Sequence, residues 1–353
     1  MSQITHGPQL LQRLRVVAPW LAADLPADEG VHLLAGIEAE IVPPESVLLK
    51  QGQTADHALL VIDGELQVTE WSGVNALETR VRGPGSAVGL EALFVPGPSP
   101  RSVQTRARAI VVRLEPELYL GALTRSLLLG GRLAARAARQ LTRRLRAMTE
   151  ELALRACSPN PEPPPPEDTP VPGVMAPHES IHGTWRADRH LLLATFDEMG
   201  LFRRVGRGRP ELAEALRADL ETVPWRFELH ARLHDEVLQP QGAAPGALHV
   251  VLAGTARREV HCDGADGTIS LKALHPGDIF GQTALCDGQG AAAEVRALGA
   301  CAVASLHPEG GIRLLEQAEH GLSSAVRLTD WMASQVAADL AFVREEWKQG
   351  AAP

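Results

Sequence analysis

The sequence predicts an α+β protein, mainly β with flanking helices, in which two antiparallel β domains are each followed by a long helix. Three observations carry this prediction. The two halves repeat the same order of helical and strand-like segments, a proline-rich segment separates them, and each half ends in a stretch with helical apolar spacing. With 353 residues, 45% of them hydrophobic, the chain can form two domains with ordinary cores.

The boundary between the halves is the segment SPNPEPPPPEDTPVPGVMAP, residues 158–177, which contains nine prolines. Proline fixes φ and removes a backbone donor, so this segment cannot continue a helix or a central strand. We interpret it as an extended, semi-rigid linker. The predicted domains are therefore residues 1–157 and 178–353.

The first half begins with two helical segments and continues with strands that alternate between turns rich in Gly, Pro and Asp. A long helical segment closes it. The predicted order is helices at 9–21 and 26–37, strands within 41–70 and 81–114, and a helix over about 116–154.

The second half repeats this order, with APGALHVVLAGTARRE (244–259) matching ADHALLVIDGELQVTE (55–70). Each of these pieces contains a glycine between two strand-like runs, which is typical of a hairpin. The predicted order is helices at 190–205 and 209–223, strands within 236–261 and 269–306, and a helical tail over about 308–348.

Each half also contains a glycine turn that leads into a short helix start, here called the cassette. The first cassette reads Gly89-Leu90-Glu91-Ala92-Leu93 and then Arg101-Ser102, and the second reads Gly281-Gln282-Thr283-Ala284-Leu285 and then Ala291-Ala292-Ala293. A helix N-terminus offers N–H groups and a partial positive charge, which favour an anion.

With these hairpins and cassettes, each half resembles a cyclic nucleotide-binding domain, the small jelly-roll-like β-roll flanked by helices that occurs in bacterial transcription regulators such as the cAMP receptor protein and in kinase regulatory subunits. The resemblance covers nearly the whole chain outside the linker. It implies that the cassette holds the cyclic phosphate, that an arginine at its end pairs with the phosphate, and that a glutamate after the turn glycine accepts from the ribose.

In the first half the resemblance assigns the ligand to Gly89, Glu91, Ala92, Arg101 and Ser102. Leu90 stands where the ribose acceptor belongs, and Glu91 is displaced by one position. Because one position on a helix is a rotation of about 100°, we expect Glu91 to point elsewhere.

In the second half the resemblance assigns the ligand to Gly281, Gln282 and Ala284. Gln282 can still hydrogen-bond a ribose. Ala291 is taken to stand in the arginine's place, which leaves a phosphate without its charge partner. Arg296 is expected on the outer face of the following strand. The second half is therefore expected to be degenerate, and the first half is the better candidate for binding cAMP, cGMP or another small ligand.

The closing helices are candidate outputs. Apolar residues recur at spacings of three and four in residues 131–154 and 321–347, so each helix has an apolar stripe. The stripes fit packing within the chain, a protein partner or self-association. The arginines of the first helix are expected to form a solvated face.

Other classes of function find little support. The net charge is −9, the linker occupies the place of a helix-turn-helix, and we expect no nucleic acid as partner. No apolar run has the length of a membrane span and no leader is evident, so a cytoplasmic protein with reduced cysteines is expected. HARLH would place His230 and His234 on one face of a helix, but no metal site or catalytic motif is expected.

The sequence thus favours a non-enzymatic regulatory or sensor protein that binds a cyclic nucleotide or related ligand in its first domain and signals to a partner. The alternative is a ligand-independent interaction or scaffold module. A transcription regulator is the less favoured third hypothesis.

Overall fold

The computed structural model describes residues 7–33, 37, 39–72, 75–155, 183–207, 209–261, 268–308 and 314–350. The predicted linker at 158–177 lies outside the described residues. Two compact units divide the chain: unit 1 comprises 1–137 with 318–322, and unit 2 comprises 138–317 with 323–353. The division falls within the long helix α5 (Leu127–Arg155).

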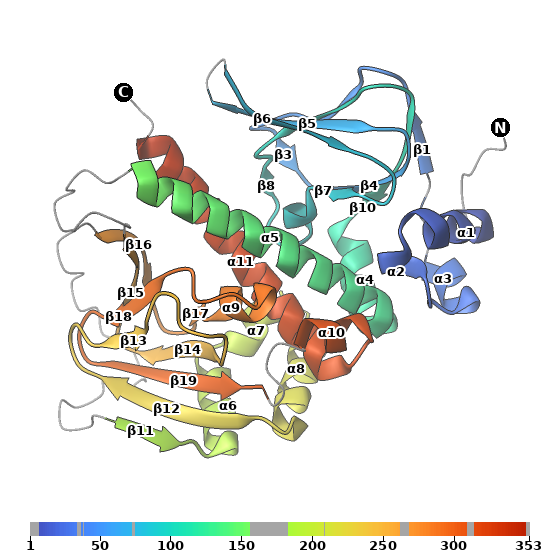
Figure 1. Cartoon of the computed structure of the whole chain (residues 1–353). Coiled ribbons are helices and arrows are strands. Elements are labelled where there is room, and N and C mark those ends of the chain that lie inside the picture. The colour runs from blue at the N-terminus through green and yellow to red at the C-terminus, as the bar shows by residue number, and fades with distance from the viewer. Residues whose placement is uncertain are drawn as a thin grey trace. The chain divides into compact units, whose positions relative to one another are not determined.

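Unit 1 contains short N-terminal helices followed by a β-roll. The helices are α1 (Gly7–Val17), α2 (Pro19–Ala22), α3 (Ala27–Leu33), η1 (Leu90–Leu93) and α4 (Pro116–Arg125). The strands are β1 (Ala39–Val42), β2 (Val47–Leu49), β3 (Thr54–Ala55), β4 (Ala58–Asp63), β5 (Leu66–Ser72), β6 (Asn75–Arg82), β7 (Ala87–Val88), β8 (Gly97–Pro98), β9 (Ser102–Thr105) and β10 (Ala109–Leu114). They form antiparallel sheets in the orders β1-β10-β4-β7, β2-β9-β5-β6 and β3-β8 (Figure 1).

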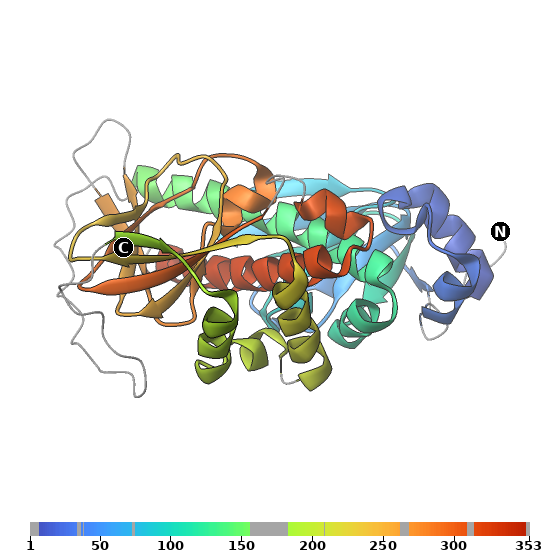
Figure 2. The same ribbon diagram turned by 90° about the horizontal axis from the view of Figure 1, so that it is seen from below.

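Unit 2 contains a second β-roll with its own helices. The helices are α6 (Arg189–Glu198), α7 (Leu201–Val205), α8 (Pro210–Thr222), α9 (Gln282–Asp287), α10 (Leu314–Glu319) and α11 (Ser323–Gly350). The strands are β11 (Gly183–Arg186), β12 (Arg226–Arg232), β13 (Val237–Gln239), β14 (Leu248–Ala253), β15 (Ala256–His261), β16 (Thr268–Leu274), β17 (Ile279–Phe280), β18 (Glu294–Ala297) and β19 (Cys301–His307). The sheets run β11-β12-β19-β14-β17 and β13-β18-β15-β16, and Figure 2 shows α6, α7 and α8 grouped together below the roll.

The two hairpin glycines mark the same place in both rolls. Gly64 joins β4 to β5 with φ +78°, and Gly254 joins β14 to β15 with φ +75°. A Cβ at Gly254 would lie 2.1 Å from the carbonyl oxygen of Ala300, so only glycine fits. The predicted repeat of two antiparallel β-rolls with flanking helices is therefore confirmed.

Each roll has an apolar core made by alternate residues of its strands. In the first roll the core includes Leu66, Val68 and Val103, and in the second it includes Ala256, Val295 and Val303. Alternate residues of a strand face the same side. The positions of these core residues therefore show which polar side chains of the same strands point into the roll.

The predicted helix over 116–154 is interrupted at Ser126, so that α4 and α5 are separate helices. Within the described residues no helix is long and apolar enough to cross a membrane. Cys286 and Cys301 are buried free thiols, and burial raises the pKa of each to about 12.

Candidate functional site

Both cassettes begin with a glycine in the left-handed region. Gly89 has φ +78° and precedes η1, and Gly281 has φ +85° and precedes α9. A Cβ at Gly281 would lie 2.5 Å from the carbonyl oxygen of Ala247. The chain therefore turns sharply from β7 or β17 into a short helix at each of these positions.

In the first cassette the predicted ribose position is apolar. Leu90 is fully buried, Ala92 is 2% exposed, and Glu91 is half-buried. The side chain of Glu91 thus points away from the buried side of η1, where Leu90 lies. This is the direction that its displacement by one position predicts.

Arg101 lies on the core side of the first roll. Val68 pairs with Val103 and Thr69 with Ser102, so Arg101 continues the side of Val103 and Glu70 continues the side of Val68. The Nε atom of Arg101 lies 3.5 Å from Oε2 of Glu70, and both side chains are about four-fifths buried, with 20% and 23% exposed. The cassette arginine is therefore directed inward and forms an ion pair with a carboxylate of β5, while its buried Nε has no hydrogen-bond partner among the described residues.

The loop before Arg101 is fixed by backbone contacts. The N–H of Gly52 donates to the carbonyl of Ser99, the N–H of Ser99 donates to the carbonyl of Gln53, and β8 pairs with β3. Ser102 Oγ accepts from the N–H of Gln51 at 3.2 Å. Its hydroxyl hydrogen can still be donated to a ligand.

In the second cassette the strand register changes one assignment. Gly64 matches Gly254, Leu66 pairs with Thr105, and Ala256 pairs with Ala297. Counting back four residues from Thr105 and from Ala297 equates Arg101 with Ala293. Arg101 and Ala293 each lie twelve residues after their cassette glycine, so the two cassettes have the same length, and the expectation that Ala291 replaces the arginine was wrong by two positions.

The other predicted residues of the second cassette are buried. Gln282 and Ala284 are each 1% exposed. Arg296 lies on the outer face of β18, as predicted, because Val295 and Ala297 face the core and Arg296 pairs with Glu294.

A small cavity of about 30 Å³ lies beside this cassette, entirely within unit 2. Its lining includes cassette residues Gly281, Gln282 and Ala293, residues Leu145 and Thr149 of α5, and residues Asp339, Phe342 and Val343 of α11. Such a volume holds about two water molecules, whereas ligand pockets typically measure about 300–1,000 Å³. The two helices therefore fill most of the space next to the cassette.

Asp339 is the acidic group in the lining of this cavity, and it is 1% exposed. Its carboxylate accepts from Arg258 Nη1 at 2.7 Å, Gln282 Nε2 at 2.9 Å, Gln335 Nε2 at 3.2 Å and Lys272 Nζ at 3.3 Å. The sequence analysis missed this group. The sequence did contain an indication of a buried carboxylate, because Asp339 lies beside Val336 and Leu340 of the apolar stripe of α11.

Helix α5 also contacts the second cassette. Arg146 Nε donates to Asp287 Oδ2 at 2.9 Å, and Arg146 Nη2 donates to the carbonyl of Gly290 at 2.9 Å. In unit 1, Arg132 donates to the carbonyl of Leu21 at 3.0 Å, and Arg136 stacks 5.1 Å from the ring of Trp20. These arginines therefore make specific contacts within the chain rather than forming the solvated face that was expected.

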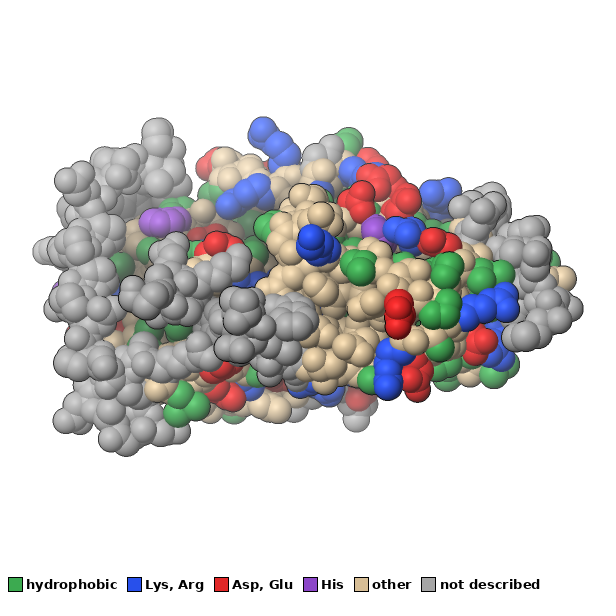
Figure 3. Space-filling view, turned by 90° about the horizontal axis from the view of Figure 1, so that it is seen from above, with side chains coloured by type: hydrophobic (Ala, Val, Ile, Leu, Met, Phe, Trp, Pro, Cys, Tyr) green, Lys and Arg blue, Asp and Glu red, His purple; other side chains and the backbone are tan. Residues whose placement is uncertain are grey.

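The apolar stripes of the two helices are buried in this conformation. The buried stripe residues are Leu133, Ala137, Leu141 and Leu145 in α5 and Val326, Ala333, Val336, Leu340 and Val343 in α11. On the face shown in Figure 3, acidic and basic side chains are interspersed and form no single basic surface. A partner or a second copy that binds these helices remains a prediction.

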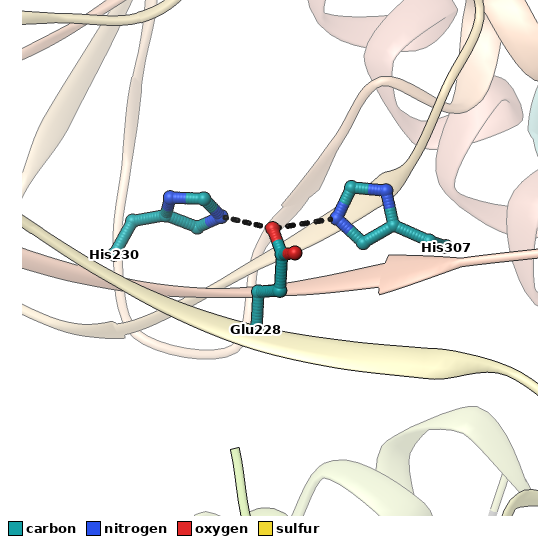
Figure 4. A group of neighbouring side chains, drawn as sticks. All are labelled: Glu228, His230 and His307. Carbon is teal, nitrogen blue, oxygen red and sulfur yellow. Dashed lines mark ion pairs between the residues drawn. The ribbon is translucent and has the colours of Figure 1, made fainter. Parts of the chain in front are cut away.

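A second polar cluster lies on β12 and β19, where Glu228, His230 and His307 converge (Figure 4). Glu228 Oε2 lies 3.8 Å from His230 Nε2 and 3.2 Å from His307 Nε2. His230 is on a strand, so the predicted helical pairing with His234 was wrong. Burial lowers the pKa of His230, and nearby Arg232 lowers it further.

This cluster is already supplied with positive charge. Arg226 Nε lies 3.0 Å from Glu228 Oε1, and Arg232 is near enough to lower the pKa of His230, so both guanidinium groups would repel a divalent cation at Oε2. The arrangement fits an Arg226–Glu228 ion pair with two imidazoles beside it.

Comparison with known proteins follows the two rolls. The family described as the cyclic nucleotide-binding domain matches twice, over residues 39–125 and 233–318. No curated protein sequence matches the chain.

Solved structures similar to this chain include the regulatory domain of Toxoplasma gondii PKA with cAMP, at 16% identity over 89% of this chain and 95% of that one, with a TM-score of 0.30. The regulatory subunit of a cAMP-independent protein kinase A from Trypanosoma brucei has 13% identity over 89% and 91%, with a TM-score of 0.28. A cyclic nucleotide-binding domain from Methylobacillus flagellatus has 18% identity over 41% and 84%, with a TM-score of 0.36. Because these scores are low, the assignment rests on the two family matches: the chain carries two tandem domains of the cyclic nucleotide-binding domain family.

Proposed function

We propose that this protein is a non-enzymatic regulatory sensor whose first roll binds a cyclic nucleotide, cAMP or cGMP, and transmits binding to a partner protein in the cytoplasm. Gly89, Ala92, Arg101 and Ser102 would hold the ligand, with Glu91 at the edge of the site. The observation that carries this proposal is the inward-facing Arg101, held by Glu70 on the core side of the roll.

The chemistry of these residues suits a phosphodiester. A guanidinium forms charge-assisted hydrogen bonds with phosphate oxygens, and the contact of Arg101 with Glu70 is at Nε, 3.5 Å from the carboxylate. The hydroxyl of Ser102 and the N–H groups that follow Gly89 are further donors. Since Leu90 replaces the ribose acceptor, we expect weaker discrimination at the ribose than in a site with a glutamate there.

Calorimetric titration of the full chain with cAMP and with cGMP tests the proposal. We expect saturable binding of at least one nucleotide, and Arg101→Ala should weaken it at least about tenfold. Arg106→Ala is the matched control, because it removes the same charge from the same segment. Arg106 is exposed and pairs with Glu65. No binding of either nucleotide, or equal binding by Arg101→Ala, would refute the proposal.

A second candidate is a ligand-independent interaction module. Side chains of α5 and α11 leave only a small cavity beside the second cassette, which favours an interaction module for the second roll. It predicts that Arg101→Ala leaves the binding of a partner protein unchanged, as measured by co-purification with partners of the intact chain.

A further inference from the structure

The two rolls differ at one inward-facing strand position. Counting from the hairpin glycines, Val68 of the first roll matches Arg258 of the second, and these residues pair with Val103 and Val295, respectively. Val68 is part of the core cluster, whereas Arg258 brings a guanidinium to the same side of β15. The second roll therefore lacks the cassette arginine at Ala293 but has an arginine on the adjacent strand.

Lys272 of β16 adds a second positive charge beside Arg258. The side chains of Arg258 and Lys272 are 11% and 22% exposed, so both charges are largely removed from water. Two cations and the amide of Gln282 form a donor set for an anion, and burial without an anion would be costly.

Asp339 supplies that anion from the chain itself. Its Oδ2 accepts from both Arg258 and Gln282, and Gln282 directly follows the turn glycine Gly281. Ala293 lines the same cavity, at the register where the first roll has Arg101. The carboxylate thus lies among the residues that the cassette would offer to a phosphate.

We propose that Asp339 is a built-in ligand of the second roll: its carboxylate occupies an anion site formed by Arg258, Lys272 and Gln282, and so fastens α11 to the cassette. The site suits one singly charged anionic group, either a carboxylate or a phosphodiester. A whole nucleotide does not fit the cavity of about 30 Å³ while α11 is in place. This inference concerns the second roll and does not depend on ligand binding in the first.

Chemical rescue tests the proposal. The experiment uses the full chain with Arg101→Ala as background, so that an anion bound in the first roll does not contribute. Asp339→Ala should lower the Tm, and sodium formate, which replaces the missing carboxylate, should raise it by about 3 °C more than sodium chloride at the same concentration. Formamide, which has the same shape without charge, should have no such effect, and the parent chain should not respond selectively to formate.

Adding Arg258→Met to Asp339→Ala identifies the site. We expect the selective response to formate to disappear, because the guanidinium that binds the anion is gone. An equal effect of formate and chloride on Asp339→Ala, or a formate response that persists without Arg258, would overturn the proposal.

A second pair of variants serves if Asp339→Ala does not fold. Arg258→Met leaves the carboxylate without its closest partner, and Arg258→Met with Asp339→Leu removes the stranded charge as well. The double variant should therefore unfold at a higher temperature than Arg258→Met alone. Independent, additive losses of Tm would mean that the carboxylate does not act as the internal anion.

Discussion

Arg258 of β15 donates to Asp339 of α11 at 2.7 Å, with the side chains 11% and 1% exposed. A buried pair of this kind is costly to break, because the remaining carboxylate stays out of water without its closest cationic partner. The pair therefore connects the C-terminal helix to the second roll by a contact that depends on both residues.

Arg258→Met should lower the free energy of unfolding by about 3 kcal/mol, since the buried Asp339 carboxylate loses its closest cationic partner and keeps Lys272 and two amides. Arg217→Met is the comparison in the same unit, because Arg217 and Asp197 are 43% and 46% exposed. That exposed pair should contribute less than about 1 kcal/mol. Denaturant unfolding followed by circular dichroism measures both, and equal losses would contradict the difference in burial.

Glu70→Ala should weaken cyclic nucleotide binding in the first roll about tenfold, because Arg101 loses the carboxylate that holds its Nε. Glu65→Ala removes an exposed carboxylate that pairs with Arg106 and should leave the affinity unchanged. Calorimetric titration of the parent protein and the two variants with the nucleotide measures the three affinities. A gain of affinity in Glu70→Ala would show that Glu70 competes with the ligand instead of orienting Arg101.

Gly281→Ala should lower the free energy of unfolding by about 3 kcal/mol, because φ is +85° and the added Cβ would lie 2.5 Å from the Ala247 oxygen. Gly242→Ala separates the two causes. Gly242 has φ +77° but no atom within 4 Å of an added Cβ, so only the backbone term of about 1 kcal/mol applies. Similar losses for both variants would contradict the close contact at the cassette.

His249 gives unit 2 a dependence on pH. Burial lowers its pKa from 6.5 to about 3, and the imidazole stacks on Phe280 and pairs with Ser305 Oγ at 2.6 Å. As the pH falls below 6.5 the unfolded chain takes up a proton that the folded chain does not, so the stabilisation present above pH 6.5 is lost towards pH 3. The loss from this group is about 1.4 kcal/mol per pH unit.

His249→Gln should remove that part of the slope between pH 6 and 4, because glutamine does not titrate there (the range follows from the ordinary histidine pKa of about 6.5). Urea unfolding at several pH values measures the slope. The lowered pKa of His230 contributes in the same direction and remains in the variant. An unchanged slope in His249→Gln would mean that His249 is protonated in the fold.

The sequence was sufficient for the features that depend on local geometry. Gly64, Gly254, Gly89 and Gly281 were recognisable because turns that need positive φ select glycine, and all four have it. The inward position of Arg101 was not predicted, because it depends on the register in which β9 pairs with β5.

Other features depend on pairing between distant segments. The match of Arg101 with Ala293 is fixed by the pairing of β15 with β18. From the sequence, Ala291 was placed there, although Arg101 and Ala293 each lie twelve residues after their cassette glycine. Asp339 lies 57 residues from Gln282, and only the packing of α11 brings them together. His230 was misassigned because a spacing of four suits a helix but says nothing about the strand partners that place it on β12.

The position of α5 determines where the chain can be divided to express one β-roll alone. A fragment that starts after the proline-rich segment would lack residues 138–155, and with them Leu145 and Thr149 at the cavity and the Arg146 partner of Asp287. A fragment that stops at residue 137 would instead cut a continuous helix. Expression of the second roll in isolation is therefore better begun upstream of α5, near Glu115, where an extended residue precedes α4.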